Sequence, residues 1–189
     1  MFVSFNTLGN QTTARNQENL NGKKSDVFMN NDKNDLLSTK PYNHKTTLHV
    51  KTPDMLYSGA NGAGVSFYLK YAEESTKENP IVKATGIDEK GNEFEQTISL
   101  NNIDPANATY VEMRALESHN NVFHGIMSMT SLPLDCGKMA LNERANFFDM
   151  YEKGIKDFNK LGRFDLATVY EKCYQSYMDI ADRQKNTEL

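Results

Sequence analysis

The chain has 189 residues, 38% of them hydrophobic, and a formal net charge of −4. This charge disfavours a regulator that binds nucleic acid, because non-specific binding depends on neutralising phosphates with Lys and Arg. No apolar run approaches the roughly 20 residues that span a bilayer. The first residues also lack the apolar core of a signal peptide. We therefore expect a cytoplasmic protein with no membrane partner and no nucleic-acid partner.

Residues 1–43 differ in composition from the rest of the chain. They contain nine Asn, and five Lys or Arg face four Asp or Glu. Such a segment cannot bury enough apolar surface to offset its chain entropy. We predict an Asn-rich polar arm, either disordered or ordered by docking, ahead of a single domain over residues 44–189. Its apolar residues are candidates for an interaction: Phe2, Phe5, Val27, Phe28 and Met29.

The domain is predicted to begin with two short segments. His44–Thr52 alternates between two faces and is followed by Pro53, which indicates a strand. Ser58–Gly64 is rich in glycine, but no Lys-Ser or Lys-Thr follows it and the next element is a strand. A phosphate-binding loop needs both the lysine and a helix N-terminus. We therefore interpret this stretch as a flexible turn.

Val65–Tyr71 alternates with a period of two and predicts a half-buried strand whose inner face includes Tyr71. Ile81–Ile87, rich in β-branched residues, predicts a second strand. Asp88–Asn92 then predicts a turn with Gly91 in the left-handed conformation. The returning strand is Glu93–Leu100, and Gln96 on its inner face is expected near an edge or in a hydrogen bond. A short turn makes this sheet antiparallel.

A helix is predicted after the sheet. Thr109 and Glu112 have the spacing of a capping box, so we start the helix near residues 107–109 and end it near Ser118. The run Ile103–Thr109, with Glu112-Met113 and Ala115-Leu116 after it, resembles a pattern in small uncharacterised proteins of Firmicutes bacteria. This resemblance covers about residues 64–116. It implies a bacterial source and no activity, substrate or catalytic residue.

The segment His119–Gly137 is predicted to be irregular, because Pro133 excludes a continuous helix. The alternative function, an enzyme with an unfamiliar site, is assigned to this segment. A Cys–His dyad of Cys136 with His119 or His124 is one arrangement that the segment allows. The histidine pairs are five residues apart, which is off-phase for one helix face. Two distant cysteines make neither a metal pair nor a disulfide framework. We therefore expect reduced thiols, no metal site and no cofactor.

Residues 138–184 are predicted to form an antiparallel two-helix hairpin that packs on the sheet. The first helix is expected from Met139 to Gly162, which acts as its C-terminal cap. The second runs from about Asp165 to Arg183. The expected apolar stripes of the two helices are Phe147, Phe148, Tyr151, Ile155, Phe158 and Leu161, then Leu166, Tyr170, Cys173, Tyr177 and Ile180.

The whole pattern predicts the α+β class: a small antiparallel sheet with a following helix over residues 44–118, an irregular connector over 119–137, and the hairpin. No known catalytic, nucleotide or metal motif occurs in the sequence. The helical stripes and the arm contain more aromatic residues than solubility needs. We therefore expect a non-enzymatic accessory, adaptor or self-associating protein, with a protein partner or a second copy as its ligand. Tyr170, Tyr174 and Tyr177 are further candidate interaction residues.

Overall fold

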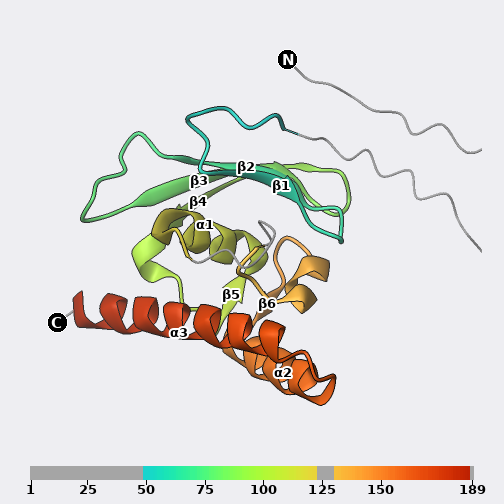
Figure 1. Ribbon diagram of the computed structural model, residues 1–189. Coiled ribbons are helices and arrows are strands. Elements are labelled where there is room, and N and C mark those ends of the chain that lie inside the picture. Colours follow the sequence, from blue (N-terminus) through green and yellow to red (C-terminus); the bar gives the residue numbers. More distant parts are fainter. Residues whose placement is uncertain (1–48, 123–129, 188–189) are drawn as a thin grey trace, which may run out of the picture. The chain divides into compact units, whose positions relative to one another are not determined.

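The computed structural model describes residues 49–122 and 130–187. Its largest element is a four-stranded antiparallel sheet in the order β1-β2-β3-β4 (Figure 1). The strands are β1 (Tyr57–Ala60), β2 (Ser66–Tyr71), β3 (Ile81–Ile87) and β4 (Glu93–Ser99). Each strand pairs with its neighbours in the chain, so the predicted antiparallel sheet and the α+β class are confirmed. The predicted arm, residues 1–43, lies outside the described residues.

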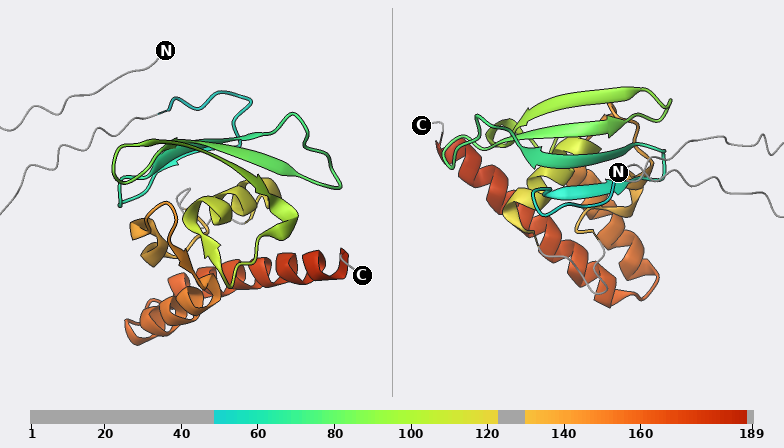
Figure 2. Two further views of the ribbon diagram at one scale, coloured as in Figure 1. Left: turned by 180° about the vertical axis from the view of Figure 1, so that it is seen from behind. Right: turned by 90° about the horizontal axis from the view of Figure 1, so that it is seen from above.

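One face of this sheet forms the core. Phe67, Leu69 and Val82 are 0% exposed, and Ile98 is 4% exposed. The alternation of side chains in β-strands places them on one face, and Val82 lies opposite Ile98 in the register of β3 and β4. The helix α1 (Tyr110–Asn120) covers this face, and none of the helices in the described residues covers the opposite one (Figures 1 and 2).

The turn between β3 and β4 has the predicted form. Gly91 has a φ of +87°, a conformation that side chains with a Cβ rarely adopt. Asp88 fixes the loop, because its Oδ1 accepts hydrogen bonds from the backbone N–H groups of Lys90 and Asn92 at 2.9 and 2.8 Å. Gln96 lies on β4, an edge strand of the sheet, as expected.

The first strand differs from the prediction. Residues 49–52 are not in a strand, and residues 44–48 of the expected strand lie outside the described residues. Instead β1 takes the first half of the glycine-rich stretch, so the turn is shorter than expected. Asn61 closes it, since its Oδ1 accepts from the N–H groups of Ala63 and Val65 at 3.0 and 3.1 Å. The glycines therefore belong partly to a strand rather than wholly to a flexible turn.

The capping box of α1 is confirmed. Thr109 Oγ1 accepts from the backbone N–H of Glu112 at 3.2 Å, and Glu112 Oε2 accepts from that of Thr109 at 2.8 Å. Two short strands were not predicted, β5 (Ala108–Thr109) and β6 (Arg144–Ala145), which pair with each other. Arg144 Nη2 lies 2.7 Å from Glu112 Oε1. Glu112 therefore caps the helix and also holds the chain that returns from the connector.

The first helix of the hairpin begins later than expected. A 3-10 turn, η2 (Leu134–Lys138), precedes it, and α2 spans Phe147–Lys160, so the predicted start at Met139 is wrong. Asn146 sets the true start, because its Oδ1 accepts from the N–H groups of Phe148 and Asp149 at 3.0 and 3.4 Å. Asn is a preferred N-cap residue, and this bond satisfies donors that a helix start leaves free.

The helix α3 spans Phe164–Thr187 and runs antiparallel to α2, which confirms the hairpin (Figure 1). Gly162 has a φ of +69° and ends α2 as predicted. Leu161 was expected in the buried stripe but is 73% exposed, because the chain turns away at Gly162. The hairpin lies on the side of α1 that faces away from the sheet (Figures 1 and 2). It packs on α1 and the connectors, with α1 between it and the strands.

Within the described residues, none of the helices combines the length and the apolar character needed to cross a membrane.

Candidate functional site

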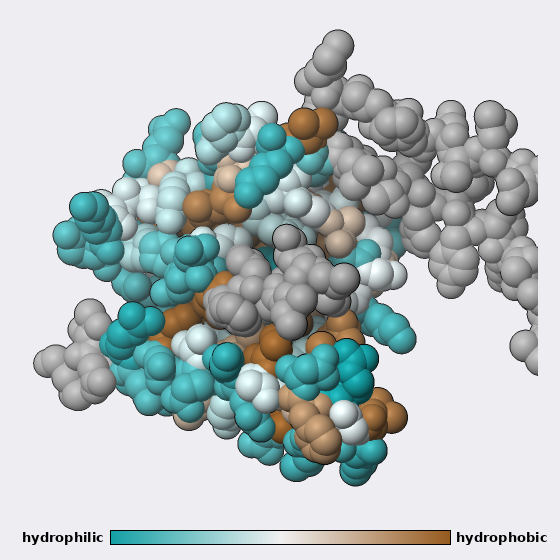
Figure 3. All heavy atoms as spheres, in the orientation of Figure 1, coloured by the Kyte–Doolittle hydropathy of each residue, from teal (hydrophilic) through white to brown (hydrophobic). Residues whose placement is uncertain are grey.

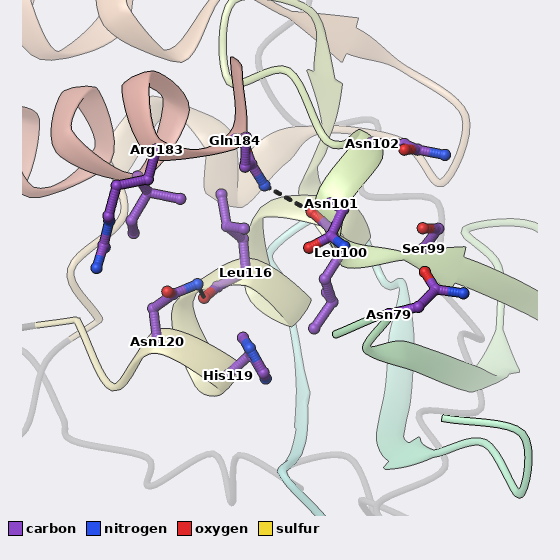
Figure 4. Close-up of a pocket in the computed structure, with 11 residues that line it drawn as sticks. Asn79, Ser99, Leu100, Asn101, Asn102, Leu116, His119, Asn120, Arg183 and Gln184 are labelled. Carbon is purple, nitrogen blue, oxygen red and sulfur yellow. Dashed lines mark hydrogen bonds between the residues drawn. The ribbon is translucent and has the colours of Figure 1, made fainter. Parts of the chain in front are cut away.

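A polar hollow of about 500 Å³ opens where β4, α1 and α3 meet (Figure 4). Its walls come from the loop before β3, the end of β4 with the 3-10 turn η1 (Leu100–Asn102), the last turns of α1, and α3. The lining residues are Asn79, Ser99, Leu100, Asn101, Asn102, Leu116, His119, Asn120, Ile180, Arg183 and Gln184. Sequence reasoning missed this site, because its residues are far apart in the chain and match no motif.

Carboxamide side chains dominate the hollow, and several have their NH₂ groups already bonded. Gln184 Nε2 donates to the Leu100 carbonyl at 2.7 Å, and Asn120 Nδ2 donates to the Leu116 carbonyl at 3.0 Å (Figure 4). Asn101 Nδ2 donates to the carbonyl of Glu78 at 2.9 Å. Their amide oxygens remain as acceptors. The hollow therefore presents carboxamide oxygens that can accept hydrogen bonds from hydroxyl or N–H groups.

His119 stands between this hollow and a second one, which has Tyr71, Ser75 and Pro80 in its lining. Its Nδ1 lies 2.8 Å from the hydroxyl of Tyr71, and the two rings meet edge to face. Burial lowers the pKa of His119, so the imidazole is neutral at pH 7. Tyr71 is 47% exposed although it was predicted to face the core, because β2 ends there. The pair shapes the rim of both hollows.

A largely buried ion pair lies on α1. Arg114 Nη1 lies 2.6 Å from Glu117 Oε2, and the two side chains are 13% and 2% exposed. Arg114 also packs over the rings of Tyr57 and Tyr110, with its guanidinium carbon 4.9 and 5.2 Å from their centroids. Stacking on aromatic rings suits a planar guanidinium better than a lysine. The positive charge of Arg114 is therefore stabilised both by the carboxylate of Glu117 and by the faces of two aromatic rings.

The connector is tied to this ion pair. Glu117 Oε1 accepts from the backbone N–H of Ser131 at 2.7 Å and from its hydroxyl at 2.6 Å. The Ser131 hydroxyl lies 2.8 Å from that of Tyr177, and the hydroxyl of Tyr151 donates to the Ser131 carbonyl at 2.7 Å. One polar network thus joins α1, the connector and both helices of the hairpin. Its role is to hold these layers together, because its groups are hydrogen-bonded to one another and are buried or nearly so.

The alternative enzymatic site is not supported by the geometry around Cys136. This thiol is 2% exposed, and burial raises its pKa to about 12, so the reactive thiolate is disfavoured. Cys173 is buried as predicted, and burial raises its pKa to about 11. His119 is engaged with Tyr71, and His124 lies outside the described residues. Across the described parts of the chain, no group of His, Cys, Asp and Glu could hold a metal ion.

The candidate interaction residues on α3 are mostly structural. Tyr177 is 0% exposed and cannot contribute to a surface, which corrects its assignment as a candidate. Tyr174 packs edge to face on Phe148 and Tyr151, with ring centroids 5.5 and 6.2 Å apart. Tyr170 accepts the backbone N–H of Leu134 at 2.9 Å. Five other candidates, in the predicted arm, lie outside the described residues: Phe2, Phe5, Val27, Phe28 and Met29.

The exposed apolar side chains of the hairpin lie at its tip instead. Leu161 is 73% exposed and Phe164 is 66% exposed, on the two sides of the turn at Gly162. Figure 3 shows hydrophobic atoms at this end of the hairpin, among polar neighbours. We call Leu161 and Phe164 the hairpin tip. The sequence pattern placed Leu161 in the core and did not identify Phe164. Helical periodicity shows which residues share a face, but it does not show how far along the hairpin other elements pack against that face.

No family model, no curated protein and no solved structure matches this chain.

Proposed function

We propose that this protein is a non-enzymatic interaction protein that self-associates through the hairpin tip. The observation that carries the proposal is the exposure of Leu161 and Phe164, at 73% and 66%. Large apolar side chains that are clustered and exposed mark interaction surfaces more often than single scattered ones do. Aromatic residues at the centre of a small patch are also the usual anchors of protein interfaces.

The charges next to the tip favour a second copy over a charged partner. Arg163 and Asp165 flank Phe164 and form a two-pronged ion pair, with N–O distances of 3.0 and 2.9 Å. On α2, Lys156 also has an acidic neighbour, Glu152, at a single N–O distance of 3.7 Å. In a two-fold contact the same patch meets itself, so Arg163 of each copy can face Asp165 of the other. A uniformly charged partner would gain little here.

Other features fit the same proposal. We also propose a bacterial source, from the resemblance, and a cytoplasmic setting, from the sequence pattern. The hollow around His119 is wide, polar and without an activated nucleophile among the described residues. A protein whose function is association needs no such group.

Sedimentation velocity over a rising concentration series tests this proposal. The wild-type chain should show a concentration-dependent dimer, and the variants Leu161→Ser and Phe164→Ser should remain monomeric. Val50→Ser is the matched control, because Val50 is 70% exposed but lies outside the hairpin. It should dimerise like the wild type. A wild-type chain that stays monomeric, or tip variants that still dimerise, would show that the proposal is wrong.

A further inference from the structure

The outer edge of β4 is a second surface with a defined chemistry. The bond from Asp88 N to the Asn92 carbonyl (2.9 Å) and the bond from Leu100 N to the Pro80 carbonyl (3.0 Å) fix the pattern of the β3–β4 ladder. Hydrogen-bonded pairs alternate along an antiparallel ladder. The even-numbered residues of β4 therefore bond to β3, and the backbone groups of the odd-numbered residues point away from the sheet.

These outward groups are available. Glu93, Glu95 and Thr97 are exposed, and no backbone hydrogen bond to them exists outside the β3–β4 ladder in the described structure. At the other edge of the sheet, β1 has four residues, whereas β4 has seven. No helix lies beyond β4 in the view from above (Figure 2). A row of free N–H and C=O groups on an edge strand is a template for another strand.

The side chains of the same three residues determine which strand fits. They lie on the sheet face that no helix of the described residues covers, and two of the three are carboxylates. Glu95 forms an ion pair with Lys83, with an N–O distance of 3.0 Å, whereas Glu93 has no ion pair in the described structure. Residues directly opposite each other in an antiparallel pair are neighbours on one face, and opposite charges there are stabilising.

We propose that β4 binds an extended peptide segment with Lys or Arg at alternate positions, which adds to the sheet as a fifth, antiparallel strand. Backbone bonds to Glu93, Glu95 and Thr97 would provide affinity that is independent of sequence. The basic side chains of the peptide, on the uncovered face, would provide selectivity. Acidic residues on the edge disfavour a second copy at this position, since a copy would bring its own Glu93 and Glu95 to the same face.

This surface is separate from the hairpin tip, and the two can be tested separately. The probe is a fluorescent synthetic heptapeptide that alternates Lys with Val, titrated into the full chain and followed by anisotropy. A second peptide with Glu in place of Lys is the control for charge. The wild-type chain should bind the Lys peptide at least about tenfold more tightly than the Glu peptide. Equal binding of the two, or no binding of the Lys peptide, would overturn the proposal.

Thr97→Pro tests the backbone bonds. Proline removes an N–H that points outward and leaves the bonds of Gln96 and Ile98 to β3 in place, so the sheet is retained. The variant should lose at least about tenfold in affinity, which corresponds to about 1.4 kcal/mol, while Thr97→Ala should bind like the wild type. Binding that Thr97→Pro leaves unchanged would mean simple charge attraction and would overturn the proposal. So would a wild-type dimer that Thr97→Pro abolishes, because the occupant would then be a second copy.

Amide hydrogen exchange on the wild-type chain keeps the test independent of how the proline variant folds. Saturating Lys peptide should slow exchange at Glu93, Glu95 and Thr97. The amides of Gln96 and Ile98 should change little, because they are already bonded to β3. Protection of the even-numbered amides alone, or of none, would contradict a fifth strand.

Discussion

Arg114 Nη1 and Glu117 Oε2 lie 2.6 Å apart inside the domain, one helical turn from each other on α1. Glu117 also accepts two hydrogen bonds from Ser131. Removing one partner of a buried ion pair lowers the free energy of unfolding by more than the intact pair contributes to it, because the remaining charge is buried without a partner. This pair is therefore the most sensitive point of the polar network that joins the sheet side to the hairpin.

Glu117→Gln should destabilise the domain strongly. The substitution keeps the shape of the side chain but leaves the charge of Arg114 uncompensated, which costs about 3–5 kcal/mol for a buried pair. Urea unfolding followed by circular dichroism measures the change. Glu95→Gln is the control, because its pair with Lys83 is exposed and should contribute little. Equal stability of the two variants would contradict the role assigned to the network.

The same carboxylate predicts a pH dependence. Burial alone would raise the pKa of Glu117, but the charge of Arg114 and the bonds from Ser131 and Arg114 outweigh it, and the pKa is lowered. Its stabilising effect is therefore complete above its usual pKa of 4.5 and is lost as the pH falls through the lowered value. The stability difference between the wild type and Glu117→Gln should narrow between pH 5 and pH 3 in urea titrations. A constant or widening difference would contradict this.

Gly154→Ala should destabilise the hairpin, although alanine normally stabilises a helix interior by about 1 kcal/mol relative to glycine. A Cβ at residue 154 would lie 2.5 Å from a ring carbon of Tyr170, so the helices would have to separate or the ring move. Overpacking of this kind costs about 1–3 kcal/mol. Thermal unfolding measures the effect. Gly137→Ala, where a Cβ meets nothing within 4 Å, is the control and should be nearly neutral.

The two thiols should react slowly in the folded protein. Burial raises the pKa values of Cys136 and Cys173 to about 12 and about 11, so little thiolate exists at pH 8. A disulfide reagent such as Ellman's should label neither within minutes under native conditions and both quickly in denaturant. Rapid labelling of either thiol without denaturant would reopen the possibility of a nucleophilic cysteine.

Local signals predicted much of the fold. The alternation in Ile81–Ile87, the turn at Gly91 and the capping box at Thr109 each depend on residues close together in the chain, and all three are present. The start of α2 was missed because the apolar pattern continues before Asn146, whereas the helix begins only after this residue, which caps it. A cap is a single side chain, whereas periodicity is averaged over a window.

The candidate site was harder to predict, for a physical reason. The hollow around His119 brings Asn79 and Gln184 together, and no local pattern connects residues so distant in sequence. The buried Arg114–Glu117 pair looks like an ordinary surface pair on a helix, since three-residue spacing is typical of solvent-exposed faces. Phe164 is exposed because the hairpin extends beyond the elements that pack against it. Only the three-dimensional packing shows where this happens.

Self-association through the hairpin tip is tested most directly by the distance between spin labels on two copies. Lys160→Cys places a label beside the tip, where the native side chain is 78% exposed, and the buried native thiols should stay unlabelled. Pulsed dipolar spectroscopy at dimer-forming concentration should give a short, well-defined distance between copies at this position. A label at Lys90→Cys, in the β3–β4 turn, should give a longer or unresolved distance. No dipolar signal at residue 160, or a short distance at residue 90 alone, would contradict the account.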